Sequence, residues 1–185
     1  MNAFQEQLNF SIRRAARDDV PDIVRLLADD PLGSRRENYQ NSLAQSYYDA
    51  FDEIKQDLHN ELVIAEVDGE VIGTLQLTFI PYLTYRGGKR AQIEAVRIAR
   101  KHRSHSIGGK LFEWAIMRAR EEQCHMVQLT TNNTRSDAHR FYERLGFVAS
   151  PFRHEARVEA SKLILESCVA CSDTCNESNP QTFFH

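Results

Sequence analysis

The chain of 185 residues lacks a long hydrophobic run and a strong excess of charge of either sign. No apolar stretch approaches the roughly 20 residues that a membrane-spanning helix needs, so we predict no contact with a membrane. The formal net charge is −3 at pH 7, so no overall basic field points to nucleic acid as a partner. Residues 1–19 contain no apolar core of a signal peptide, and we therefore expect a cytoplasmic protein.

Cysteine is scarce, with four residues in the whole chain. Three of them, Cys168, Cys171 and Cys175, gather near the end, where they could hold zinc with His185 as a fourth ligand. A second CxxC pair or a close CxxH pair is missing, whereas zinc motifs supply a complete set of ligands. We therefore favour three reduced thiols and predict no metal site.

The chain length is typical of one domain with a sizeable core. The segment 161–185 is rich in serine, asparagine and cysteine, a composition that buries little apolar surface. We expect residues 1–160 to form the domain and residues 161–185 to form a polar tail outside it, with a composition compatible with disorder.

Hydrophobic periodicity divides the domain into strands and helices. Asp68 and Gly69 separate two β-rich runs and predict a tight hairpin, and Gly146 predicts the end of the last helix. The segment 81–90 has the composition of a loop. The pattern predicts strands over residues 8–16, 61–67, 70–80, 91–99, 125–131, 147–149 and 154–160, and helices over residues 18–30, 36–58, 109–123 and 136–146.

Two of these helices carry a clear apolar stripe at steps of three and four. In the helix 36–58 the stripe contains Leu43, Tyr47, Phe51, Ile54 and Leu58, and in the helix 109–123 it contains Leu111, Phe112, Ala115, Ile116 and Ala119.

The order of the elements predicts a fold of the α/β (α+β) class. Hairpin connections imply mostly antiparallel pairing, and the strand–helix–strand segment 91–131 implies one parallel crossover. The sheet is thus mixed, with helices on both of its faces.

The turn "RSHSIGGK", residues 103–110, joins a strand to a helix and is suited to an anion. The free N–H groups of a first helical turn favour phosphate, and Gly108 and Gly109 let it approach the backbone closely. Arg103 can donate to phosphate oxygens, and Arg100, His105 and Lys110 add positive charge nearby. The alternative is that the two glycines only allow a tight backbone turn, and that the charged residues face solvent without a ligand. The P-loop pattern is excluded because leucine follows Lys110, and the dinucleotide pattern GxGxxG is absent.

Arg103, Ser106 and Gly108 stand at the three named positions of [QR]-x-x-G-x-[GA], the pyrophosphate motif of the GCN5-related N-acetyltransferases. The chain resembles this superfamily over roughly residues 8–160, most clearly in "IEAVRIARKHRSHSIGGKLFEWAIMRA" and "HMVQLTTNNTRSDAHRFYERLGF". The resemblance implies the mixed fold predicted above. It also implies an enzyme that transfers acetyl from its cosubstrate acetyl-CoA to a primary amine of a small molecule, by direct attack in a ternary complex.

The resemblance also implies where acetyl-CoA binds. The backbone from Ser104 to Gly109 would hold the pyrophosphate beside Arg103, and the strand backbone at Val96–Ile98 would bond the pantetheine arm. Arg135 stands where many members carry a cofactor-binding asparagine, and Asn132 or Asn133 could replace it. The implied cosubstrate residues are Val96, Arg97, Ile98, Arg103, Ser104, His105, Ser106, Ile107, Gly108, Gly109, Lys110, Asn133 and Tyr142.

Two residues are predicted to handle protons. Tyr142 matches the family's tyrosine and would protonate the leaving thiolate, although its spacing with Phe141 and Leu145 equally suits a packed core stripe. Glu94 would act as the base, with its pKa raised because Gln92, Glu94, Val96 and Ile98 alternate onto one face. The alternatives are a structural glutamate and a base position two residues earlier, at Gln92.

The acceptor side is expected between the first two helices, the loop 81–89 and the last hairpin. Candidate lining residues there are Tyr47, Tyr48, Asp52, Tyr82 and Tyr85.

Three alternatives to a small-molecule enzyme stay open. They are acetylation of a protein lysine or N-terminus, a non-catalytic acyl-CoA-binding module, and a nucleic-acid binder that uses the basic run 97–110. A homodimer is also left open. Ser106 bears on the binding module. At a positive φ, serine costs about 1 kcal/mol relative to glycine, whereas at a negative φ it costs little and its hydroxyl could donate to a phosphate.

Overall fold

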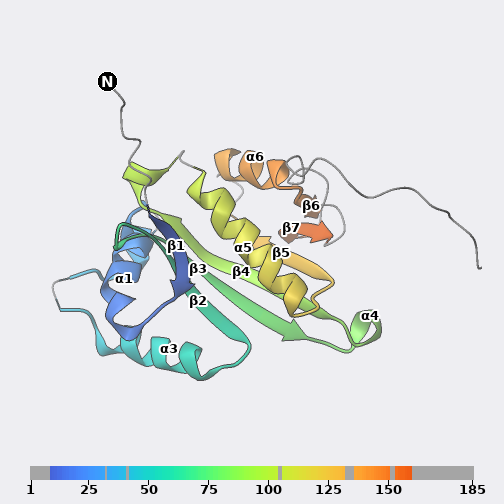
Figure 1. The fold of residues 1–185 in the computed structure, drawn as a ribbon, viewed down its shortest axis with the longest axis horizontal. Helices are drawn as coiled ribbons and strands as arrows, with labels where there is room; N and C mark the ends of the chain where they lie inside the picture. The colour runs from blue at the N-terminus through green and yellow to red at the C-terminus, as the bar shows by residue number, and fades with distance from the viewer. Residues whose placement is uncertain are drawn as a thin grey trace, which may run out of the picture.

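The computed structural model describes residues 9–31, 33–40, 42–103, 106–131, 136–150 and 153–159. These residues form one twisted sheet with helices on both faces (Figure 1). The strands are β1 (Phe10–Arg14), β2 (Asn60–Val67), β3 (Glu70–Pro81), β4 (Lys89–Ile98), β5 (Met126–Thr130), β6 (Val148–Ser150) and β7 (Arg153–Glu159). The helices are α1 (Val20–Ala28), α2 (Gly33–Arg36), α3 (Gln45–Gln56), α4 (Thr84–Gly87), α5 (Ile107–Glu121) and α6 (Ser136–Arg144), with 3₁₀ turns at Arg17–Asp19 and Arg100–His102.

The predicted mixed sheet is confirmed. Its strand order is β1-β2-β3-β4-β5-β7-β6. The pair β4–β5 is parallel, because α5 carries the chain back across the sheet, and the other described pairs are antiparallel. β7 lies between β5 and β6, so the last hairpin extends the sheet beyond β5.

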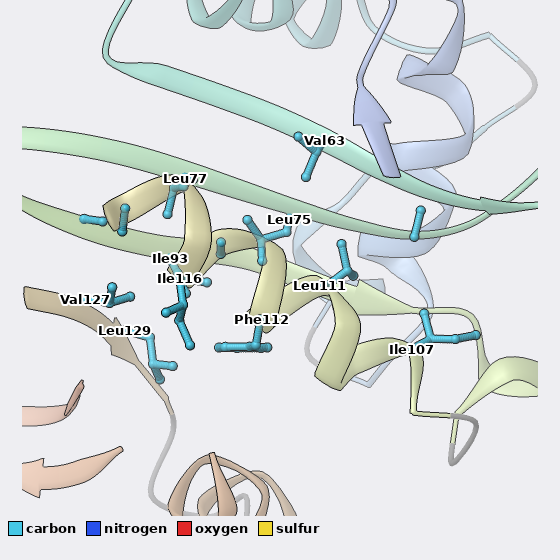
Figure 2. Packing of buried hydrophobic residues seen from close by; sticks show 14 of the residues in the cluster. Val63, Leu75, Leu77, Ile93, Ile107, Leu111, Phe112, Ile116, Val127 and Leu129 are labelled. Carbon is cyan, nitrogen blue, oxygen red and sulfur yellow. The ribbon is translucent and has the colours of Figure 1, made fainter. Parts of the chain in front are cut away.

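The largest apolar cluster lies between α5 and the sheet (Figure 2). All five residues of the predicted stripe of α5 are buried in it, against strand residues such as Leu75, Leu77 and Ile93. On the opposite face, α1 and α3 cover two smaller clusters, which contain Leu26 and Ile64 in one case and Val24 and Phe51 in the other. The sheet therefore has a large core on the α5 side and a divided core on the α1 side.

Two turn predictions are confirmed. Asp68 and Gly69 have φ values of 49° and 81°, so both central residues of the β2–β3 hairpin are left-handed. Gly146 has φ 83°, and the Phe147 N–H donates to the Tyr142 carbonyl, which ends α6.

The predicted helix over residues 36–58 is wrong in its extent. α3 begins at Gln45, because Ala44 has an extended ψ of 141°, and it ends at Gln56. The Asp57 carboxylate then accepts from the His59 N–H, which turns the chain into β2. Leu58 lies in this turn and is 94% exposed, so it does not belong to the predicted apolar stripe.

The predicted loop 81–90 contains one compact turn, α4. Tyr85 and Arg86 have φ values of 53° and 60°, so this turn is left-handed, which is strained for residues with a Cβ atom. Tyr85 stacks on His125 at 5.0 Å between ring centroids, and the Tyr82 hydroxyl lies 2.7 Å from His125 Nε2. These ring contacts hold the tip of the β3–β4 hairpin against the start of β5.

Within the described ranges, no helix combines the length and the apolar character that crossing a membrane requires. The predicted tail 161–185, with Cys168, Cys171, Cys175 and His185, lies outside the described residues. The division into a domain and a tail stays a prediction.

Candidate active site

A gap opens in the middle of the sheet where β4 and β5 separate. Their parallel pairing runs from Arg90–Met126 to Ile93–Leu129 and ends there. β4 continues to Ile98 beside β3 alone. The edge of β4 beyond Ile93 therefore presents backbone N–H and C=O groups that β5 does not pair.

A β-bulge in β4 coincides with this gap. Thr74 pairs with Arg97 and Gln76 pairs with Glu94, so the single residue Leu75 faces both Ala95 and Val96. Ala95 has φ 53°, a left-handed conformation. The bulge shifts the alternation of the strand by one residue at this point.

This shift corrects the predicted face of Glu94. Val96 and Ile98 pack against the α5 core together with Ala91 and Ile93, so they do not share a face with Glu94. Glu94 is exposed, and the apolar surroundings that the alternation suggested are absent. At the alternative position, Gln92 accepts from the Gln128 side chain at 2.6 Å.

A cleft of about 570 Å³ occupies the gap. Its lining comes from both faces of the sheet, since α1 and α2 contribute on one side and α6 on the other, so the cleft passes between β4 and β5. The lining residues are Leu27, Asp30, Arg36, Glu37, Gln76, Ile93, Glu94, Ala95, Val96, Arg97, Leu129, Thr130, Thr131 and Tyr142.

A buried ion pair forms part of the α1 side of the cleft. Arg97 Nε lies 3.5 Å from Asp30 Oδ2, and both side chains are largely buried. The other oxygen of Asp30 accepts from the Gly33 N–H at 2.5 Å. A Cβ atom on Gly33 would stand 1.9 Å from the Leu27 carbonyl oxygen, so this turn requires glycine. The turn after α1 thereby fixes Asp30 against β4.

Two other charged side chains of the cleft stand apart from any ion pair. Glu94 and Arg36 each lack a hydrogen-bond or ion-pair partner within the part of the chain that the structure describes. Glu37, by contrast, accepts from the Tyr47 hydroxyl at 3.1 Å. Among the described lining residues, the cleft thus presents the Glu94 carboxylate and the Arg36 guanidinium to a ligand, beside the Glu37 carboxylate that Tyr47 holds.

An ion pair also fixes the start of α1. Arg13 donates to both oxygens of Asp19, and the Ala16 N–H donates to Oδ2. Burial raises the pKa of Asp19, but these hydrogen bonds outweigh burial, and the pKa falls below its ordinary value.

Tyr142 stands on the opposite side of the cleft. Its ring packs against Phe112 at 5.5 Å, Phe141 at 5.6 Å and Phe147 at 6.0 Å between centroids. The core-stripe interpretation is therefore correct for the ring, while the residue also lines the cleft. The aromatic contacts hold this side chain in a fixed position.

The N-terminus of α5 follows the end of β4. Ser106 is the residue before the helix and has φ 60° and ψ 4°. Its backbone is therefore left-handed, the conformation in which serine is less favourable than glycine. A Cβ atom on Gly108 would lie 3.3 Å from the Phe141 ring, whereas one on Gly109 would meet nothing within 4 Å. Gly108 therefore serves the packing of α6 on α5, and Gly109 leaves the first turn of the helix open.

The basic residues of this turn have other contacts in the structure. Arg103 donates to the Ile98 carbonyl at 3.0 Å and lies 3.5 Å from Asp29, which also pairs with Arg100 at 3.0 Å. Lys110 Nζ lies 4.5 Å from the centroid of the Phe10 ring. Asp29 thus ties the end of α1 to the turn before α5.

The structure brings together some of the residues chosen from the sequence. Glu94, Val96, Arg97 and Tyr142 all line the cleft. Ile98 continues β4, and the side chain of Ile107 is buried in the core, so only its backbone is available at the turn. Ser104, His105 and Asn133 lie outside the described residues.

Most of the tyrosines expected at the acceptor side lie elsewhere. Tyr82 and Tyr85 pack at the opposite end of β4 from the gap. Tyr48 lies under the Arg17 guanidinium, which also pairs with Asp52 at 3.5 Å. Tyr47 lines a separate small pocket beside the cleft.

Sequence reasoning missed several residues of the α1 side, above all Asp30, Arg36 and Glu37. The available signal was the segment "DDPLG", in which an acidic pair and a glycine end a helix. That signal predicts a turn, but it does not say that the turn folds back onto β4.

Comparison with known proteins gives consistent results. The family model described as "Acetyltransferase (GNAT) family" matches residues 23–147, which is more than half of the chain. An aminoalkylphosphonate N-acetyltransferase from Salmonella typhimurium (strain LT2) is 29% identical over 143 residues, which are 77% of this chain and 87% of that protein.

Solved structures share the fold. A transcriptional regulator from Bacillus halodurans C-125 is 51% identical, with a TM-score of 0.75 over 77% of this chain and 95% of its own. A predicted acetyltransferase from Clostridium acetobutylicum, solved with acetyl-CoA, is 18% identical, with a TM-score of 0.60 over 77% of this chain and 92% of its own. The family match and the splayed β4–β5 cleft agree: the chain belongs to the GNAT family and is an acetyl-CoA-dependent N-acetyltransferase.

Proposed function

We propose that the enzyme acetylates the primary amine of a small molecule that also carries an anionic group, by direct attack within a ternary complex. The observation that carries this proposal is the single cleft that Glu94 and Tyr142 both line. Because the cleft passes through the sheet, acetyl-CoA can enter from the α5 side while the amine enters from the α1 side.

Acetyl-CoA would bind along the open edge of β4 and at the start of α5. The backbone at Val96–Ile98 would hydrogen-bond the pantetheine arm, since β5 does not pair this edge. The first N–H groups of α5, with the residues from Ser104 to Gly109, would hold the pyrophosphate. Arg103 would exchange its contact with Asp29 for the phosphates.

The chemistry needs one base and one acid. The ammonium group of the acceptor loses a proton to Glu94, directly or through a water molecule, and the neutral nitrogen attacks the thioester carbonyl carbon. A backbone N–H of β4 stabilises the oxyanion. The C–S bond then breaks, and Tyr142 gives its proton to the thiolate of CoA. The nitrogen loses its second proton through water to the tyrosinate, which leaves a neutral amide and restores Tyr142.

Charge selects the class of acceptor. Glu94 can attract an ammonium group and Arg36 an anion, and neither has another partner in the described parts of the chain. The relative from Salmonella typhimurium is named for aminoalkylphosphonates, which combine these two charges. A mixture of basic and acidic lining residues suits a basic peptide less well, so a small zwitterion is favoured over a protein lysine.

The test is a screen of acceptors with release of free CoA as the readout, beside a separate titration of acetyl-CoA binding. The panel holds aminoalkylphosphonates, α-amino acids, simple amines, polyamines and lysine peptides. We expect turnover with the zwitterions. Binding of acetyl-CoA without turnover of any member would indicate a non-catalytic acyl-CoA-binding module, and preference for peptides would contradict the small-molecule acceptor.

One comparison favours a second function. The relative from Bacillus halodurans is described as a transcriptional regulator, and the run 97–110 of this chain is basic. Salt-sensitive binding of DNA that CoA does not displace would support nucleic acid as a partner. Loss of DNA binding on addition of CoA would assign the basic run to the cosubstrate. The cytoplasmic location and a homodimer stay predictions.

A further inference from the structure

A second pocket lies between α1, α3 and the sheet, with a volume of about 140 Å³. We call it the side pocket. Its polar lining is limited to Tyr47 and Gln76. The apolar lining residues are Val20, Ile23, Val24, Leu27, Ala50, Phe51, Ile54, Leu62 and Ala95.

The side pocket adjoins the reaction cleft. Leu27, Gln76 and Ala95 line both cavities. Ala95 is the bulged residue that follows Glu94, and its side chain at this junction is a single methyl group. An acceptor whose ammonium group meets Glu94 therefore has the mouth of the side pocket next to it.

The chemistry of the pocket favours an apolar guest over water. Buried water needs two to four polar partners, and this lining offers few. An apolar cavity of about 150 Å³ in another protein stays dry and binds benzene. The side pocket is therefore large enough for a branched alkyl group or a phenyl ring, and too small for a fused double ring.

We propose that the side pocket is a subsite for the apolar side chain of the acceptor. The proposal rests on the proposed function and narrows it: the acceptor is an α-amino acid or a 1-aminoalkylphosphonate with an apolar side chain no larger than benzyl. Its ammonium group lies at Glu94, its anionic group lies toward Arg36, and its side chain enters between α1 and α3.

The first test uses the wild-type enzyme and two series of acceptors. One runs through glycine, alanine, leucine, phenylalanine and tryptophan, and the other through the 1-aminoalkylphosphonates with the same side chains. Release of free CoA gives kcat/KM for each. We expect kcat/KM to rise by up to roughly fourfold for each buried methylene group, to peak at the branched or phenyl side chain and to fall at the indole. Values that do not depend on the side chain would overturn the subsite but leave the proposed function standing, whereas no acetylation of any member would overturn both.

The second test obstructs the pocket. Ala50 is an exposed residue of α3 that lines the side pocket, so Ala50→Phe adds a ring at its rim, and Glu53→Phe adds the same ring at an exposed position of α3 outside it. The measured quantity is the ratio of kcat/KM for phenylalanine over that for alanine, with thermal unfolding as a check on both variants. We expect Ala50→Phe to lower this ratio at least tenfold and Glu53→Phe to leave it within twofold. An unchanged ratio in a folded Ala50→Phe would overturn the proposal, and the wild-type series decides alone if this variant does not fold.

Discussion

The two walls of the cleft are built differently. The wall that carries α5 and α6 rests on the largest apolar cluster, and aromatic contacts fix Tyr142 upon it. The opposite wall, made of α1 and α2, rests on two smaller clusters and on the Asp30–Arg97 pair, and a pocket opens beside it between α1 and α3. A dense apolar core holds one geometry, whereas a divided core with ion pairs leaves room for a variable guest. The first wall therefore suits the fixed cosubstrate and the second the individual acceptor.

The largest expected effect comes from the chemistry of the first wall. In Tyr142→Phe the ring and its packing stay, but the proposed proton donor for the thiolate is lost. We expect kcat to fall by about 10²-fold or more while the Kd for acetyl-CoA changes less than twofold. Steady-state rates and a binding titration measure the two quantities. An unchanged kcat would remove Tyr142 from the acid role and leave it as a core residue.

Glu94→Gln tests the proposed base, which belongs to the second wall. The amide cannot take the proton and carries no charge to attract an ammonium ion, so we expect kcat/KM for the amine to fall by about tenfold to a hundredfold and its dependence on pH to change. Glu53→Gln, an exposed change on α3, serves as the control. A pH–rate profile that coincides with that of the wild type would place the base elsewhere.

A pair of glycine substitutions separates the walls directly. In Gly33→Ala the new methyl group meets the Leu27 carbonyl oxygen and disturbs Asp30, so we expect a loss of about 1–3 kcal/mol in unfolding free energy and a raised KM for the amine. In Gly109→Ala the methyl group meets no protein atom within 4 Å, so we expect unchanged stability but a weaker Kd for acetyl-CoA. Denaturant unfolding measures the stability of both variants, and the KM for the amine and the Kd for acetyl-CoA measure which substrate each variant affects. Weaker binding of the same substrate in both variants would contradict the assignment of acetyl-CoA to one wall and the amine to the other.

Much of the first wall could be predicted from the sequence, because its signals are local. The stripe of α5, the glycine after α6 and the turn before α5 each depend on residues close in the chain. The bulge at Ala95 could not be predicted, since it depends on the register of β4 against β3, and it reversed the face of Val96 and Ile98.

Most residues of the second wall could not be predicted from the sequence, for the same reason. Its residues come from a turn after α1 and from the separate strand β4, so their proximity is a tertiary fact. The prediction of a helix over residues 36–58 was wrong in its extent because periodicity does not mark where a helix begins, and Ala44 has an extended backbone. Tyr48, Tyr82 and Tyr85 lie away from the cleft, because a tyrosine near a site in the sequence serves equally well in packing, whereas Tyr47 lines the side pocket.

The smallest predicted effect concerns Ser106. Glycine tolerates the observed φ of 60° without strain, so Ser106→Gly should raise the unfolding free energy by about 1 kcal/mol. Gln123→Gly is the matched control, because Gln123 has φ 58° just after the other end of α5. Both variants should gain stability, but only Ser106→Gly should tighten acetyl-CoA. Equal effects on the Kd in both variants would contradict a role for position 106 in binding the cosubstrate.

The central claim is that acetyl-CoA and the amine occupy one cleft at the same time and that acetyl passes directly between them. Initial rates measured over a grid of both substrate concentrations test it, with the best acceptor of the screen. Direct transfer predicts double-reciprocal lines that intersect, and acetyl-CoA binding without the amine present. Parallel lines, together with acetyl bound covalently to the protein after incubation with acetyl-CoA alone, would contradict it.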